Sequence, residues 1–130
     1  MKIDRLDHFV LTVASIDVTC EFYRRVLGFE RQSLDGKPIS LGFGRQKINV
    51  HQADRTFEPK ARVPTPGAAD FCLVTLDPID AIVAHLGRCG VAIEKGPVER
   101  TGAVGPMTSV YFRDPDGNLI EVSRYQSDKS

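Results

Sequence analysis

Hydrophobic and polar residues alternate in several short stretches of the chain, a pattern that predicts β-strands. These stretches are residues 6–14, 29–34, 38–43, 46–53, 69–76, 107–113 and 118–125. Two other segments repeat apolar residues at intervals of three or four, which predicts amphipathic helices. The first begins at Ser15 or Asp17 and ends at Gly28, and the second runs from Ile79 to Gly90. Each half of the chain therefore starts with a strand followed by a helix.

The segments between these elements contain the residues that favour turns and loops. Asp35-Gly36 predicts a tight hairpin turn, and residues 114–117 predict the turn between the last two strands. Residues 54–67 contain three prolines and predict a linker. We expect a short strand at 91–95, followed by a Gly- and Pro-rich loop over 96–106.

The two halves of the chain also match residue by residue. A shift of 62 places aligns His8-Phe9-Val10-Leu11 with Asp70-Phe71-Cys72-Leu73, and a shift of 72 places aligns Ile48-Asn49-Val50 with Ile120-Glu121-Val122. An internal repeat of this kind indicates duplicated structural units. It predicts an α+β fold of two βαβββ modules, in which eight strands form a cupped mixed sheet with the helices on its convex face.

Length and composition fit one soluble domain of ordinary type. The 130 residues are predicted to divide into module one at 4–53, a linker at 54–67, module two at 68–125 and a frayed tail at 126–130. The 17 Lys and Arg residues balance the 17 Asp and Glu residues, so the charge gives no indication of binding to nucleic acid or to a membrane surface.

The cellular compartment is predicted from the lack of a membrane-spanning stretch and of a segment that resembles a signal peptide. No apolar stretch approaches the roughly 20 residues that span a bilayer, and the N-terminal residues do not resemble a signal peptide. We therefore expect a cytoplasmic protein. The three cysteines Cys20, Cys72 and Cys89 have no CxxC spacing, and we expect them to be small buried hydrophobic residues.

Strand periodicity groups four polar side chains on one face of the predicted sheet. Residues i and i+2 of a strand share a face, and apolar neighbours fill the face that packs on the helices. This leaves the opposite face to His8, Asn49, Asp70 and Glu121. An imidazole, two carboxylates and an amide form a donor set that suits a divalent cation. The alternative is an ordinary solvated face, against which the recurrence of these positions in the repeat argues.

Three segments resemble the vicinal oxygen chelate superfamily, which includes glyoxalase I, fosfomycin-resistance transferases, methylmalonyl-CoA epimerase, extradiol dioxygenases and bleomycin-binding proteins. They are the opening Leu6-Asp7-His8, the helix end Phe22-Tyr23-Arg24-Arg25-Val26-Leu27-Gly28-Phe29, and the block Tyr111-Phe112-Arg113-Asp114-Pro115-Asp116-Gly117-Asn118-Leu119-Ile120-Glu121-Val122. The resemblance covers nearly the whole chain. His51 and the stretches 57–60 and 99–102 further resemble a narrower subgroup, glyoxalase domain-containing protein five.

The resemblance implies a metal site to which both modules contribute. His8 matches the ligand of the first strand and Glu121 the ligand of the last strand. Asp70 stands where glyoxalase I and the fosfomycin enzymes usually carry His, and Asn49 stands where glyoxalase I has Glu. Because carboxylates dominate this set, the expected cofactor is a divalent metal, with Mn, Fe, Ni, Zn and Mg all compatible. His51, two residues beyond Asn49, is expected either to complete the metal site or to contact the substrate.

The activity implied is that of a metal-dependent, glyoxalase-like lyase or isomerase acting on a small oxygenated substrate. The metal would chelate two adjacent oxygens and stabilise an enediolate, with Glu121 as the base. One alternative is an extradiol-type ring-cleaving dioxygenase, although Asp70 replaces the second imidazole of its ligand triad. The other is a metal-free drug-binding resistance protein.

The expected partners are a small-molecule substrate and a second copy of the chain. Tyr111, Arg45 and Arg100 are candidates for substrate contacts, the arginines either meeting an anionic group or lying solvated in loops. We expect a homodimer because uncovered sheet edges favour association. The identity of the substrate does not follow from these residues.

Overall fold

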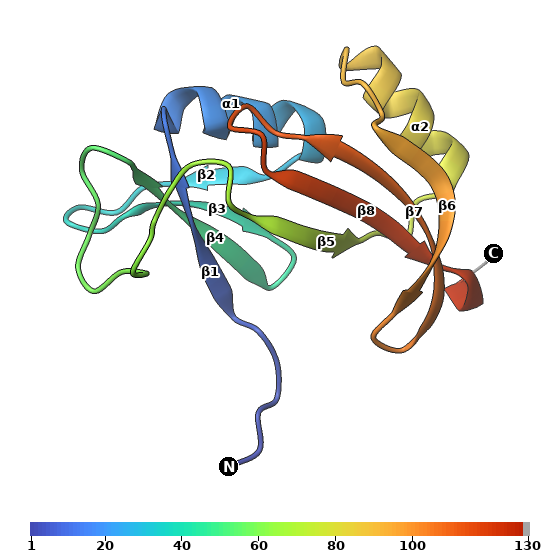
Figure 1. Ribbon diagram of the computed structural model, residues 1–130, viewed down its shortest axis with the longest axis horizontal. Coiled ribbons are helices and arrows are strands. Elements are labelled where there is room, and N and C mark those ends of the chain that lie inside the picture. Colours follow the sequence, from blue (N-terminus) through green and yellow to red (C-terminus); the bar gives the residue numbers. More distant parts are fainter. Residues whose placement is uncertain (129–130) are drawn as a thin grey trace. The chain divides into compact units, whose positions relative to one another are not determined.

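Each half of the chain forms a four-stranded mixed sheet with one helix packed on it (Figure 1). The computed structural model describes residues 1–128. The first unit, residues 1–68, contains β1 (His8–Val13), α1 (Ile16–Leu27), β2 (Glu30–Gln32), β3 (Ile39–Phe43) and β4 (Gln46–Gln52). The second unit, from Ala69 onward, contains β5 (Asp70–Val74), α2 (Ile79–Arg88), β6 (Lys95–Gly102), β7 (Gly105–Arg113), β8 (Leu119–Tyr125) and the 3-10 turn η1 (Gln126–Asp128).

The two sheets have the same topology. Their strand orders are β1-β4-β3-β2 and β5-β8-β7-β6, and in each sheet only the first pair is parallel. The parallel pair follows from the helix, which returns the chain to the start of the sheet before the next strands begin. The prediction of an α+β fold of two βαβββ modules is confirmed, and the eight strands form two four-stranded sheets.

The two parallel pairs also have the same register. His8 lies opposite Lys47 in the first unit, and Asp70 lies opposite Leu119 in the second. Asn49 and Glu121 each come two residues further along the partner strand. The sequence shifts of 62 and 72 places therefore correspond to equivalent register positions.

The core of each unit lies between the helix and its own sheet. In the first unit α1 contacts β2, β3 and β4, and the fully buried Tyr23 meets Phe29 with their ring centroids 5.8 Å apart. Phe29 in turn stacks on Phe43 at 4.3 Å. In the second unit Ile82 and Leu86 of α2 are buried, as are the sheet residues Val110, Phe112, Ile120 and Val122.

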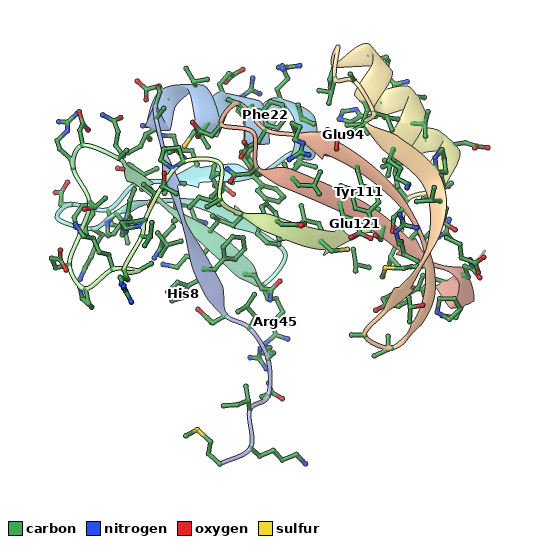
Figure 2. All side chains as sticks on the ribbon, in the orientation of Figure 1. His8, Phe22, Arg45, Glu94, Tyr111 and Glu121 are labelled. Carbon is green, nitrogen blue, oxygen red and sulfur yellow. The ribbon has the colours of Figure 1, made fainter. Side chains whose placement is uncertain are left out.

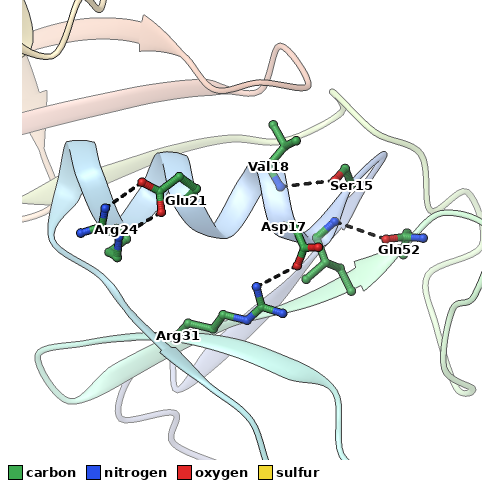
Figure 3. A network of polar contacts seen from close by, with 8 residues as sticks. Ser15, Asp17, Val18, Glu21, Arg24, Arg31 and Gln52 are labelled. Atoms are coloured by element: carbon green, nitrogen blue, oxygen red, sulfur yellow. Dashed lines mark hydrogen bonds and ion pairs between the residues drawn. The ribbon is translucent and has the colours of Figure 1, made fainter.

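Polar contacts fix the N-terminal end of α1 (Figure 3). The Ser15 hydroxyl accepts a hydrogen bond from the Val18 amide at 3.3 Å, which confirms Ser15 rather than Asp17 as the N-cap. Asp17 instead accepts from Arg31 of β2 at 2.9 Å. At the other end Gly28 has a φ of 72°, the left-handed conformation that a helix C-cap favours.

The segment after α2 differs from the sequence prediction. Instead of a strand at 91–95 and a loop over 96–106, the structure has β6 over Lys95–Gly102, paired with β7 from Gly105 onward. Because β6 is an edge strand, it tolerates Pro97, which would break a central strand. The pairing shifts register between Lys95 and Val98. Gly96, at φ 110°, lies in this irregular stretch, and a Cβ there would come within 2.5 Å of the Ser109 carbonyl oxygen.

The segments outside the two modules contain little regular structure. Residues 53–69 form no helix or strand apart from an isolated bridge between Gln52 and Arg55. The predicted tail begins with η1, and its residues 129 and 130 lie outside the described residues. Among residues 1–128, neither helix is long and apolar enough to cross a bilayer.

Candidate functional site

The face of the second sheet that does not carry α2 has three rows of paired residues across β5, β8 and β7. The rows are Asp70–Leu119–Arg113, Cys72–Glu121–Tyr111 and Val74–Ser123–Ser109. Side chains of paired residues lie on the same face of a sheet, and the residues between these rows form the buried face instead. The helix-free face is therefore polar around Glu121, as strand periodicity predicts.

Two buried serines hold the carboxylate of Glu121. The Ser109 hydroxyl donates to Glu121 Oε2 at 2.7 Å, and the Ser123 hydroxyl approaches the same oxygen at 3.2 Å. Both serines are fully buried, and their hydroxyl oxygens lie 2.6 Å apart. Both of these hydroxyl contacts are made to Oε2, and neither is made to the other oxygen, Oε1. One oxygen of Glu121 is thus fixed, while the other is available to a ligand.

Cys72 lies beside this carboxylate and is exposed, which corrects the prediction of a buried residue. The reason is that Phe71 and Leu73 take the helix side of β5, so Cys72 takes the opposite side. Its Sγ lies 3.2 Å from the Ser123 hydroxyl oxygen. Partial burial of the thiol raises the pKa of Cys72, and the Glu121 charge acts in the same direction. Cys72 therefore adds no negative charge to this face at neutral pH.

Tyr111 and Arg100 contact each other next to Glu121. Tyr111 lies directly opposite Glu121 on the adjacent strand (Figure 2). The Tyr111 hydroxyl accepts a hydrogen bond from Arg100 Nε at 2.9 Å, and Arg100 Cζ lies 5.5 Å from the centroid of the Tyr111 ring. The structure thus brings together two of the residues that the sequence singles out for substrate contacts.

Asp70 begins β5 and is exposed, one register step from Glu121. Arg113 lies in its row and is bound by Glu94 through two hydrogen bonds of 2.9 Å. The bond with Glu94 is the main cause that raises the pKa of Arg113, and the Asp70 charge adds to it. The carboxylates of Asp70 and Glu121 occupy diagonal positions on one face.

In the first unit, Asp7 orients the imidazole of His8. Asp7 Oδ2 lies 2.7 Å from His8 Nδ1, and this hydrogen bond is the main cause that lowers the pKa of Asp7. Within residues 1–128, nothing bonds to His8 Nε2. A carboxylate on the second ring nitrogen is the usual outer partner of a metal-ligating histidine. Asn49 is half-buried and lies diagonal to His8 on the same face.

His51 and Arg45 occupy very different surroundings. His51 is 5% exposed, and its ring centroid lies 5.2 Å from that of Phe57. Burial lowers the pKa of His51, so the imidazole is neutral at neutral pH. Arg45 lies exposed in the turn between β3 and β4 (Figure 2).

Each unit holds two of the four ligands predicted for a metal. Within the described part of the chain, no three His, Cys, Asp or Glu side chains come close enough together to hold a metal ion. The individual donors nevertheless suit one: His8 presents Nε2 with its Nδ1 already bonded, and Glu121 presents Oε1 with its Oε2 already bonded. The chemistry of the donor set thus fits a divalent cation.

The model of the Glyoxalase/Bleomycin resistance protein/Dioxygenase superfamily matches residues 5–122. The chain belongs to this superfamily. Virulence protein STM3117 from Salmonella typhimurium is 54% identical over 125 residues, which make up 96% of this chain and 87% of that protein. Its crystal structure superimposes with a TM-score of 0.94, covering 96% of this chain and 99% of that one. Glyoxalase domain-containing protein RDO1 from Mycosarcoma maydis is 48% identical over 129 residues, covering 99% of this chain and 73% of RDO1.

More distant members of the superfamily share the fold. A lactoylglutathione lyase from Agrobacterium tumefaciens has a TM-score of 0.73 at 24% identity, covering 95% of this chain and 96% of its own. The antibiotic-binding protein TnmS3 from Streptomyces sp. CB03234 has a TM-score of 0.74 at 23% identity, covering 97% and 99%. At these identities the likeness establishes the glyoxalase-type fold alone.

Three residues around the site of this superfamily member were missed by the sequence reasoning. Ser109 and Ser123 hold Glu121, and Asp7 holds His8. The serines were detectable, because each is two residues from a candidate on its own strand and must share its face. Asp7 precedes the strand, so strand periodicity does not place its side chain.

Proposed function

We propose that this chain is a metal-dependent lyase or isomerase of the glyoxalase type, acting on a small oxygenated substrate. The observation that carries the proposal is the carboxylate of Glu121, which has one oxygen fixed by two buried hydroxyls and the other available. A carboxylate held in this way can accept a proton only through its other oxygen, Oε1. That is what a general base needs, because proton transfer depends on the position of the base relative to the carbon that loses the proton.

The residues that would hold the metal are His8, Glu121 and Asp70, with Asn49 or His51 as a further ligand. When bound, a divalent metal polarises the carbonyl of a substrate that chelates it through two adjacent oxygens. His8 suits this role through its Nε2, since Asp7 already occupies Nδ1. His51 is neutral, the form of imidazole that binds metals.

Glu121 then takes the proton from the carbon next to the substrate carbonyl. The proton is held at Oε1, the oxygen that Glu121 would otherwise offer to the metal, since a ligating carboxylate can detach and accept a proton. In an isomerase it is then returned to the neighbouring carbon. Ser109 and Ser123 keep Oε2 in place throughout, so the carboxylate does not rotate away from the substrate. Because the thiol of Cys72 is neutral, it does not compete with the carboxylate of Glu121 as a second negative charge in the row Cys72–Glu121–Tyr111.

The name of RDO1, a glyoxalase domain-containing protein 48% identical to this chain, supports the same class of activity. A ring-cleaving dioxygenase uses two imidazoles and one carboxylate on iron. Asp70 stands in place of one of those imidazoles and so departs from the dioxygenase triad, as it also departs from the ligand set of glyoxalase I. We further propose that the chain functions in the cytoplasm and that it forms a homodimer. Light scattering at micromolar concentration tests the homodimer through the mass of the particle.

The deciding experiment is an assay of the purified protein against a substrate panel, before and after loading with Mn²⁺, Fe²⁺, Ni²⁺ or Zn²⁺. The panel contains the hemithioacetal of methylglyoxal and glutathione, small α-hydroxy ketones, and catechols under oxygen. We expect metal-dependent turnover of a carbonyl substrate, and a loss of about 10²–10⁴-fold in Glu121→Gln. Glu30→Gln, an exposed carboxylate on β2, is the matched control and should keep full activity.

Two outcomes would overturn the proposal. Metal-dependent ring opening of a catechol would assign the chain to the dioxygenases. Silence across the panel, together with tight metal-independent binding of a drug-like ligand, would assign it to the sequestering proteins.

A further inference from the structure

Arg100 of β6 is a cation held in place without a counter-charge. Its Nε donates to the Tyr111 hydroxyl at 2.9 Å, its Nη1 donates to the Glu99 carbonyl at 3.0 Å, and its Cζ lies 5.5 Å from the Tyr111 ring centroid. Within residues 1–128, no carboxylate forms an ion pair with Arg100. Arg24, Arg31 and Arg113, by contrast, each pair with a carboxylate at 2.7 to 2.9 Å.

We infer that Arg100 and Tyr111 bind the carboxylate of a small oxo- or hydroxy-acid, an inference that rests on the function proposed for Glu121. A guanidinium has five N–H donors. Two are used by Tyr111 and Glu99, so three remain on Nη1 and Nη2. A carboxylate accepts two parallel N–H donors from a guanidinium. The Tyr111 hydroxyl accepts from Arg100 and keeps its own proton to donate to the same ligand.

The position of Arg100 and Tyr111 relative to Glu121 limits which ligands can reach both the arginine and the proposed base. Tyr111 of β7 lies opposite Glu121 of β8 in register and contacts Arg100 of β6, so Arg100 and Glu121 belong to strands on either side of β7. A ligand whose carboxylate meets Arg100 and whose reacting carbon meets Glu121 therefore has to extend past Tyr111 on this face.

The charges nearby favour a monoanion over a phosphate. Asp70 and Glu121 occupy the same face, and in the metal-free chain their carboxylates repel a second negative charge on the ligand. A carboxylate matches the single charge of Arg100. Inorganic phosphate, which is largely a dianion above pH 7, should bind more weakly.

The test compares each acid with its methyl ester, which keeps the shape and removes the charge. Pyruvate and methyl pyruvate, lactate and methyl lactate, and inorganic phosphate are titrated into the full chain by NMR, following the amides of residues 99–111. We expect the acid to bind at least tenfold tighter than the ester. Arg100→Gln should weaken acid binding by about 10- to 100-fold and Tyr111→Phe by about three- to tenfold. Arg88→Gln, an exposed arginine at the end of α2, is the matched control and should bind like the wild type.

The inference is overturned if the wild type binds acid and ester equally or not at all, or if Arg100→Gln keeps the preference. It is also overturned if phosphate binds more tightly than the acids. Repeating the titration in Glu121→Gln separates this result from the proposed function, because that variant should lose turnover and keep the preference for the acid. If Glu121→Gln keeps turnover while the acid preference depends on Arg100, the proposed base is wrong and the carboxylate site stands.

Discussion

Asp7 Oδ2 lies 2.7 Å from His8 Nδ1 at the start of β1. Because a carboxylate only accepts hydrogen bonds, the contact puts a proton on Nδ1, and in the neutral imidazole this leaves Nε2 as the acceptor. A histidine prepared in this way is a better metal ligand than a free one, because its orientation and tautomer are already set.

Asp7→Asn should therefore weaken metal binding by about 10- to 100-fold, and His8→Ala should abolish it. Isothermal titration with Mn²⁺ and Zn²⁺ measures both effects. Asp4→Asn removes another exposed carboxylate of the N-terminal segment and serves as the control. Equal affinities in Asp7→Asn and the wild type would show that the contact plays no part in metal binding.

Ser109→Ala and Ser123→Ala should each lower kcat with little change in KM. A hydrogen bond to a charged group contributes about 1.5–3 kcal/mol, so each loss corresponds to roughly tenfold or more. The prediction treats the serines as positioning residues, and steady-state kinetics with circular dichroism separates lost turnover from lost fold. Ser40→Ala removes a buried hydroxyl opposite Asn49 in the first sheet and should leave kcat unchanged. An unchanged kcat in both Ser109→Ala and Ser123→Ala would refute their positioning role.

Stability should fall with decreasing pH through the titration of His51. Burial lowers the pKa of His51 in the folded state below its ordinary value of 6.5. The unfolded chain then binds more protons than the folded one below about pH 6.5, and acid favours unfolding. Urea unfolding at pH 7.5 and 5.5 should show a larger loss in the wild type than in His51→Leu. The control, His85→Gln, should retain the loss seen in the wild type, and identical losses in wild type and His51→Leu would contradict the assignment.

Asn118→Ala should destabilise the second unit by about 2–4 kcal/mol. Asn118 is 1% exposed, and its Nδ2 donates to Asp114 Oδ2 at 2.8 Å. Its Oδ1 accepts from the Ala69 amide at 2.9 Å, which ties the start of β5 to the turn before β8. Chemical denaturation measures the change. Asp35→Ala in the exposed β2–β3 turn should change stability by less than about 0.5 kcal/mol, and an equally small change in Asn118→Ala would contradict the prediction.

The repeat and the strand periodicity were enough to predict the modules and the face on which Glu121 lies, because both depend on local alternation of apolar side chains. The β6 strand was missed because Gly96 and Pro97 resemble a loop locally, and their place in an edge strand depends on pairing with β7. Contacts such as Arg100 with Tyr111 depend on that same pairing. The pairing of β6 with β7 cannot be predicted from a single sequence, because it is set by the tertiary fold.

The tight approach of Gly96 to β7 links this edge of the sheet to the proposed base, Glu121. The carbonyl oxygen that any side chain at position 96 would strike belongs to Ser109, whose hydroxyl holds Glu121. A mutation at Gly96 would therefore displace the backbone of Ser109, which holds the proposed base Glu121, although position 96 is not among the residues proposed to bind substrate or metal. In a random library selected for stability alone, position 96 would tolerate only those substitutions that β6 accommodates by shifting outward. The surviving variants would keep nearly the same fold and differ by degrees in activity.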